Sequence, residues 1–259
     1  MPYNQYEQNP YGQQQNPYGG QQPSDLFPSL WSNEEDFAKA TSICLAKVFV
    51  RMFAALLVTA VVSFGIYQTP GAAEFLIMNP LLTIVMIVAQ LAVVMILSFR
   101  VMKMSPATAN AMFFVYAVLT GVTLSFIFLA YQIGVIFQAF AVSALMFAAM
   151  AAYGTITKRD LTRIGSICIM ALIGLIIASV INMFFMNDMM FMIINYIGVV
   201  IFIGLTAYHT QKIKKMLAEA REANQEDAIK KISIMGALTL YLNFINLFLR
   251  ILSILGRRR

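Results

Sequence analysis

The chain has one histidine, His209, and two cysteines, Cys44 and Cys168. A single imidazole excludes histidine clusters and the HExxH pattern that hold catalytic zinc. The cysteines lie in or beside apolar segments and have no CxxC spacing, which is typical of small buried side chains. The sequence therefore predicts no metal site and no cofactor.

Charge is also scarce, since charged residues make up 12% of the chain. All 12 acidic residues lie outside the long apolar runs, so neither an aspartyl-protease pair nor a carboxylate proton relay is available in mid-membrane. A serine–histidine dyad would need His209 opposite a serine, and no nucleophile motif surrounds any serine. We therefore expect neither an enzyme nor a nucleic-acid-binding protein.

Apolar runs dominate what remains, because 60% of the residues are hydrophobic. Runs of 18 or more residues can cross a bilayer core of about 30 Å, and they lack the alternation of barrel strands. We predict an all-α, polytopic membrane protein. The expected spans are roughly 46–68, 80–101, 107–130, 135–156, 165–186 and 190–211, with a more polar seventh segment over 234–255.

The two longest polar segments lie before the first span and before the seventh. The beginning of the chain is rich in Gln, Asn, Tyr, Pro and Gly, has NPYG twice and lacks the apolar core of a signal peptide. We predict a disordered cytoplasmic tail over 1–38 and a transmembrane domain over 39–259. A short interfacial helix is expected to begin after Ser32 or Asn33, and 212–233 is expected to be a long connector of mixed charge.

Lysine and arginine are distributed unevenly between the connectors. Most of the 18 lie before or early in the first span and in every second connector. They are Lys39, Lys47, Arg51, Arg100, Lys103, Lys158, Arg159, Arg163, Lys212, Lys214, Lys215, Arg221, Lys230 and Lys231. Because cytoplasmic loops carry an excess of basic residues, we predict a cytoplasmic N-terminus.

The basic residues at the end of the chain fit this rule less well. If the seventh segment spans the membrane, Arg257, Arg258 and Arg259 end on the non-cytoplasmic side. If the segment re-enters and returns, they stay inside, but the segment is long for a re-entrant piece. These residues leave both alternatives open.

Two predicted spans have polar side chains on one face. At about 100° per residue, the polar residues of the seventh segment share one side of a helix. They are Gly236, Thr239, Asn243, Asn246, Arg250 and Ser253. The same spacing groups Asn195, Gly198, Thr206 and His209 on the sixth segment. Because lipid disfavours polar groups, we expect these faces to turn toward each other or toward a shared cleft.

The polar residues have two interpretations. For Asn195, Thr206 and Thr239 we favour hydrogen bonding between helices, which small and amide residues provide in membranes. For His209, Asn243 and Arg250 we favour a functional site, because a base, an amide and an intramembrane guanidinium share one surface. Asn246 belongs to the same polar stripe as a supporting residue.

Four segments resemble the Bax inhibitor-1 (transmembrane Bax inhibitor motif) family. They are SFRVMKMSPATANAMFFVYAVLTGVTLSFI (98–127), YGTITKRDLTRIGS (153–166), LTAYHTQKIKKM (205–216) and ALTLYLNFINLFLRILSILG (237–256). The resemblance covers roughly residues 40 to 256, and the short loops are similar to those of bacterial members. It implies a seven-helix bundle with the last helix central, which favours a spanning seventh segment and, for a bacterial protein, the plasma (inner) membrane.

The resemblance also implies a site. The family's pH sensor is a pair of aspartates in YDxxKI and LYLDFINLF, and those positions are His209 and Asn243 here. A basic residue that can pair with the first aspartate corresponds to Arg100 or, in a shifted register, Lys103. We therefore expect His209 to hydrogen bond with Asn243, directly or through one water. Histidine titrates near neutrality, so a pH response can survive with altered charge.

Two functions follow from the resemblance. The first is a pH-sensitive calcium leak channel with Ca²⁺ as permeant ion and His209 and Asn243 at its gate. The second is a non-conducting regulator or partner of a membrane-anchored quality-control protease, or a stress and survival factor. Ca²⁺ prefers several charged oxygen ligands, so loss of both aspartates strengthens the second function, while the leak channel stays our leading expectation.

Overall fold

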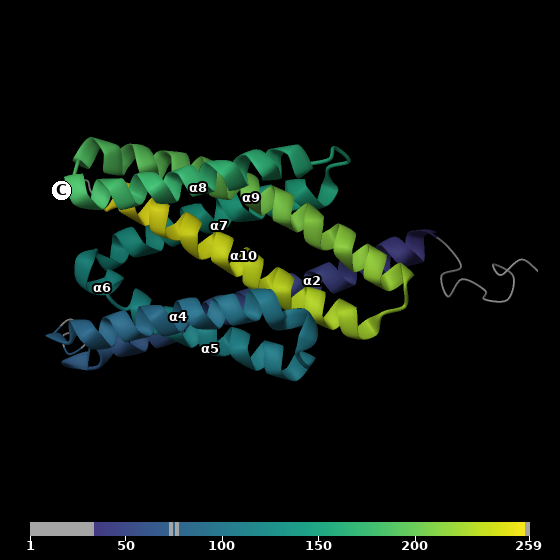
Figure 1. Cartoon of the computed structure of the whole chain (residues 1–259), viewed down its shortest axis with the longest axis horizontal. Coiled ribbons are helices and arrows are strands. Elements are labelled where there is room, and N and C mark those ends of the chain that lie inside the picture. The colour runs from purple at the N-terminus through teal and green to yellow at the C-terminus, as the bar shows by residue number, and fades with distance from the viewer. Residues whose placement is uncertain (1–33, 73–74, 76–77, 257–259) are drawn as a thin grey trace, which may run out of the picture. The chain divides into compact units, whose positions relative to one another are not determined.

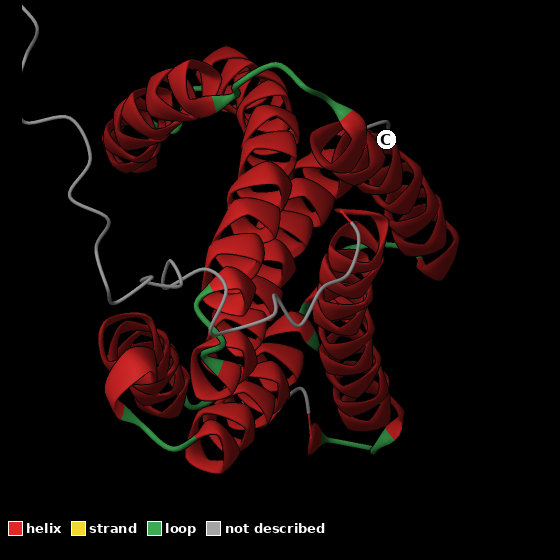
Figure 2. Ribbon diagram, turned by 90° about the vertical axis from the view of Figure 1, so that its right-hand side faces the viewer, coloured by secondary structure: helices red, strands yellow, loops and turns green. Residues whose placement is uncertain are grey.

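A computed structural model describes residues 34–72, 75 and 78–256, and within them the regular structure is helical throughout (Figure 2). The helices are α2 (Glu34–Gln68), α4 (Pro80–Arg100), η1 (Val101–Lys103), α5 (Pro106–Leu124), α6 (Ile127–Ala130), α7 (Ile133–Ile156), α8 (Thr162–Phe185), α9 (Asp188–Glu222) and α10 (Glu226–Leu255). Seven helices in this part of the chain are long and apolar enough to cross a membrane. The predicted fold class is confirmed.

The chain divides into two units, residues 1–40 and 41–259. Of the first unit, only residues 34–40 are described, and they form the first turns of α2. The expected interfacial helix is therefore the beginning of one continuous helix that runs on to Gln68. Ser32, Asn33 and most of the predicted tail over 1–38 lie outside the described residues, as do Arg257 to Arg259.

Within residues 41–259, α10 is the central helix, as predicted. It packs against α5, η1, α7 and α9, and in Figure 1 it passes between α4 and α5 on one side and α7, α8 and α9 on the other. Of its most apolar 18-residue stretch, 72% is buried, against 6% for α4. A re-entrant seventh segment is excluded, because α10 is an unbroken helix of 30 residues, about 45 Å long.

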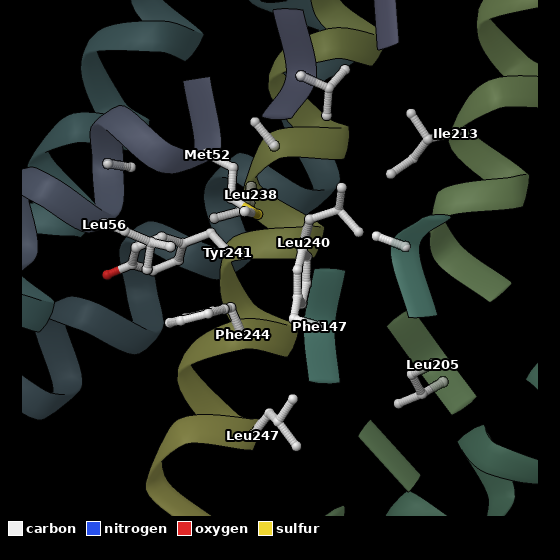
Figure 3. Close-up of a cluster of buried hydrophobic side chains, with 14 of the residues drawn as sticks. Met52, Leu56, Phe147, Leu205, Ile213, Leu238, Leu240, Tyr241, Phe244 and Leu247 are labelled. Carbon is white, nitrogen blue, oxygen red and sulfur yellow. The ribbon is translucent and has the colours of Figure 1, made fainter. Parts of the chain in front are cut away.

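Aromatic side chains of α10 hold the helices around it. The Tyr241 ring meets Phe113 of α5 edge to face at 5.8 Å, and the Phe244 ring meets Phe147 of α7 in the same way at 5.6 Å. Figure 3 shows Tyr241 beside Leu56 of α2. Lipid is as apolar as these side chains, so helix association depends on such close packing rather than on the hydrophobic effect.

The predicted connector over 212–233 is wrong. The helix α9 continues to Glu222 and α10 begins at Glu226, so only three residues separate them. The sequence KKMLAEARE after the apolar run consists of good helix formers, which continue the helix into the aqueous phase. Asn224 makes the turn with φ of 53°, a left-handed conformation that asparagine tolerates better than most residues.

Gly154 lets α7 approach α9 closely. A Cβ atom at this position would collide with the backbone carbonyl oxygen of Ala207. Since a backbone carbonyl in a helix has no freedom to move aside, only glycine fits here. The contact lies two residues before His209 and fixes this part of α9 against α7.

Candidate functional site

His209 of α9 and Asn243 of α10 are in direct contact. Asn243 Nδ2 lies 2.9 Å from His209 Nδ1, and the expected hydrogen bond is confirmed. Asn243 is buried, and the imidazole is half-buried. When Nδ2 donates, Nδ1 is the acceptor, so the ring is the neutral tautomer with its proton on Nε2.

Neighbouring residues on α9 set the surroundings of the imidazole. The ring centroid of Tyr208 lies 5.2 Å from that of His209, and Lys212 Nζ lies 5.8 Å from the Tyr208 ring centroid. Lys212 is also the charge that acts on the imidazole. Thr210 is fully buried, and its hydroxyl has no hydrogen-bond partner within the described residues. The environment is therefore basic, and no carboxylate from the described part of the chain bonds to His209.

The loop between α7 and α8 is bound to α9 through Gln211, which lies two residues after His209. The amide of Gln211 accepts a hydrogen bond from Leu161 N at 2.9 Å and donates one to Arg159 O at 2.8 Å. Lys215 Nζ also reaches Asp160 Oδ1 at 3.0 Å. These contacts fasten the α7–α8 loop to the helix that contains His209. We did not predict them, and the only sequence signal is a polar residue, Gln211, at the end of an apolar run.

Asp160 is fully exposed in this loop. Hydrogen bonds from Thr162, and then from Lys215, hold the pKa of its carboxyl below the usual value. The carboxylate therefore stays ionised well into the acid range.

Arg250 and Asn195 form the second polar contact between α9 and α10. Arg250 Nη1 donates to Asn195 Oδ1 at 3.3 Å, and Asn195 Nδ2 donates to Phe191 O of its own helix. A Cβ atom at Gly198 would lie 3.1 Å from Arg250 Cδ, so the arginine stem passes close over this glycine. The predicted role of Asn195 as an interhelical hydrogen-bond partner is confirmed.

The remaining stripe residues bond within their own helices. Thr206, Thr239 and Asn246 each donate to the carbonyl oxygen four residues earlier. Among the described residues, Thr206 and Thr239 do not make the expected interhelical bonds, because their hydroxyls are short enough to be satisfied locally. The two stripes therefore meet at two points, His209–Asn243 and Arg250–Asn195.

Arg100 and Lys103 are exposed, at the end of α4 and in η1. In the described part of the chain neither side chain bonds to His209 or Asn243. The contact between η1 and α10 comes instead from Lys231 Nζ, which donates to Met102 O at 3.0 Å.

A polar network that we did not predict lies deeper in the bundle. Tyr241 Oη and Thr59 Oγ1 are 2.7 Å apart, which joins α10 to α2. Gln90 donates to Thr120 at 3.0 Å and accepts from Thr123 at 2.8 Å, which joins α4 to α5. The Gln90 bonds hold the poorly buried α4 to the bundle. The sequence did not predict this network, because single Thr and Gln residues within apolar runs form no polar face at helical spacing.

Comparison with known proteins adds the evolutionary context. The family of inhibitors of apoptosis-promoting Bax1 matches residues 41–259. The chain belongs to the Bax inhibitor family. The Escherichia coli K12 inner membrane protein YbhL is 44% identical over 215 residues, covering 83% of this chain and 92% of that protein. An uncharacterised Borreliella burgdorferi protein is 41% identical over the same shares, and a Rickettsia prowazekii one is 38% identical over 88% of this chain and 95% of its own length.

Membership of the Bax inhibitor family confirms the resemblance seen in the sequence. Together with seven membrane-length helices, it identifies an integral, multi-pass membrane protein. Among the described residues, no group of three or more His, Cys, Asp or Glu side chains could hold a metal ion. Any cation at the His209–Asn243 contact would therefore meet few of the oxygen ligands that Ca²⁺ requires.

Proposed function

We propose that this Bax inhibitor family protein is a pH-dependent cation leak, with Ca²⁺ as the permeant ion and the His209–Asn243 contact as its gate. The observation that supports this most is the 2.9 Å contact between His209 and Asn243, the two residues that the resemblance assigns to the family's aspartate-pair positions. The contact joins α9 to the central helix α10, so separating the two residues would open the bundle along its polar stripe.

The proposed closed state follows from the chemistry of the pair. An imidazole and an amide can hydrogen bond without charge repulsion, whereas two ionised carboxylates repel each other and attract Ca²⁺. At neutral pH the pair therefore holds α9 to α10 and offers a cation only one amide oxygen. We expect a low basal Ca²⁺ leak for this reason.

Protonation changes the charge at the gate without removing the hydrogen bond. An imidazolium donates from Nδ1, and Asn243 can accept with Oδ1 after its amide turns by about 180°. The added positive charge lies near Lys212, which already acts on the imidazole. A cation approaching this point meets greater repulsion, so we expect acidification to reduce cation passage.

Ion flux into proteoliposomes tests this function, with Ca²⁺, Na⁺ and K⁺ used in turn between pH 4 and pH 8. The double variant His209→Asp/Asn243→Asp should raise Ca²⁺ flux and add a new titration, because two interacting acids share a proton. Asn246→Asp is the matched control, since the same amide-to-acid change is made at a residue that bonds only within α10. A wild-type leak as strong as that of the double variant, with the same pH profile, would show that this contact is not the gate.

A second proposal is favoured by the loss of both aspartates. The protein could serve as a non-conducting regulator or partner of a membrane-anchored quality-control protease, or as a stress and survival factor. Absence of flux from both wild type and double variant, with folded protein confirmed in the same vesicles, would favour this role. Crosslinking in native membranes should then capture a protease partner.

We further propose that the protein lies in a bacterial inner membrane with its N-terminus in the cytoplasm. The similarity to the E. coli inner membrane protein YbhL supports the location. The concentration of Lys and Arg in alternate connectors supports the orientation. On this proposal, the His209–Asn243 contact lies near the cytoplasmic face.

A further inference from the structure

A cavity of 410 Å³ lies between α8, α9 and α10, at the end of the bundle away from the lysine-rich loops. It lies beside the α8–α9 turn, where Met186 has a left-handed backbone with φ of 49°. Its volume falls within the range of about 300–1,000 Å³ that is usual for small-molecule sites. None of the proposed gate residues lines it.

The cavity contains a cationic and an acidic side chain, Arg250 and Asp188. The only hydrogen bond of the Arg250 guanidinium within the described residues is the one from Nη1 to Asn195. Its Nε and Nη2 groups therefore remain as donors for a ligand. A guanidinium in a membrane span is costly unless it meets an anion or water, and phosphate is one of the two anionic groups, with carboxylate, that its planar fork matches.

Two amides in the cavity wall supply further donors. Asn182 Oδ1 accepts from Asn187 N at 3.1 Å, and Asn187 Oδ1 accepts from Met190 N at 2.9 Å. These bonds build the α8–α9 turn and use the oxygen of each amide. In the described part of the chain neither Nδ2 group donates to protein, so both are available to oxygen atoms of a ligand.

We propose that this cavity binds a phospholipid with a zwitterionic headgroup. The phosphate would accept from Arg250 and the asparagine amides, and the headgroup ammonium would lie at Asp188. A simple anion would be repelled by Asp188 and a simple cation by Arg250, whereas a phosphate–ammonium headgroup matches both. Met183, Phe191 and Ile194 form an apolar wall for the glycerol and the first acyl carbons.

Native mass spectrometry of the purified full chain tests the proposal, with phosphatidylethanolamine and phosphatidylglycerol of equal acyl chains as probes. The wild-type protein should retain phosphatidylethanolamine in preference to phosphatidylglycerol. Arg250→Gln should weaken its binding about tenfold or more, as expected for losing a hydrogen bond to a charged group. Asp188→Asn should abolish the preference between the two lipids. Lys230→Gln, which removes a cation from the other end of α10, should leave the binding of both lipids unchanged.

Equal retention of both lipids by wild type, or unchanged binding by Arg250→Gln, would overturn the proposal. Displacement of the lipid by free phosphoethanolamine at equal concentration would identify a soluble ligand instead and would also overturn it. If Arg250→Gln does not fold, Asp188→Asn decides, because Asp188 is exposed and its change retains the shape of the side chain. The proposal does not depend on ion conduction.

Discussion

At the scale of single residues, the contact between His209 and Asn243 joins an imidazole to a neutral amide. On the proposed correspondence with the family's aspartate pair, two acids that titrate together are replaced by one base and one neutral amide. The sign of the charge change is thereby reversed, since acid neutralises a carboxylate pair but charges an imidazole. The same position can thus respond to pH with an opposite electrostatic effect on a passing cation.

Replacing the imidazole by a neutral amide isolates this response. Protonation of the imidazole should lower the wild-type leak about tenfold, which corresponds to about 1.4 kcal/mol of added repulsion. His209→Gln retains a hydrogen-bonding side chain but cannot gain a proton, so its flux should stay constant as the pH is lowered. Radiotracer Ca²⁺ uptake into proteoliposomes measures both, and an acid response that persists in His209→Gln would assign it to another group.

Asp160→Asn is the control for the acid response. Its lowered pKa, caused by Thr162 and then Lys215, means that its ion pair is complete above the usual carboxyl pKa. The pair is lost only as pH falls through the lowered value, which lies below the range tested. Asp160→Asn should therefore leave the shape of the pH profile unchanged.

At the scale of elements, the helices are placed by backbone approach as much as by side chains. Gly154 of α7 contacts the backbone of α9 at Ala207, and Gln211 ties the loop that follows α7 to α9. The α9 segment around His209 is therefore fixed on the α7 side. Movement that separates His209 from Asn243 must come from α10.

Gly154→Ala should lower the thermal stability of the purified protein. A methyl group collides with the Ala207 carbonyl, and overpacking of this kind costs about 1–3 kcal/mol, more than the roughly 1 kcal/mol gained in helix propensity. Gly174→Ala is the matched control, since no atom lies within 4 Å of its added Cβ and it should be neutral or stabilising. Equal melting temperatures of the two variants in detergent would contradict this account.

The helical spans were predictable because a bilayer requires long apolar runs. The ends of the helices were less predictable, because an apolar run marks the part in contact with lipid and not the length of the helix. Both α9 and α10 extend well beyond their membrane segments. The His209–Asn243 contact was predictable because both residues lie on polar faces at helical spacing and because the family resemblance pairs their positions. The Gln211 contacts were not, because they join a loop and a helix whose relative position depends on tertiary packing.

At the scale of the whole molecule, other helices surround α10. The helices around it present apolar surfaces that are long enough to span the lipid bilayer. The polar stripe of α10 therefore meets other helices, and residues such as Ile176 and Val200, each more than half exposed, face outward. This distribution is the reverse of a soluble protein and fits a bilayer as solvent.

Labelling of single cysteines tests the proposed orientation. In a background of Cys44→Ala and Cys168→Ala, Gln132→Cys reports on the α6–α7 connector and Lys158→Cys on the α7–α8 loop. A membrane-impermeant maleimide added to intact spheroplasts should label only the first, because basic loops stay in the cytoplasm. Labelling of Lys158→Cys alone would invert the topology.

The unbroken course of α10 has a mechanical consequence. Asn243 and Arg250 lie two turns apart on one rigid rod, about 10 Å along its axis, and each contacts α9. A rod cannot shift at one contact and stay in place at the other. Any slide of α10 that frees His209 also moves the guanidinium past Asn195, so the two polar contacts between α9 and α10 change together.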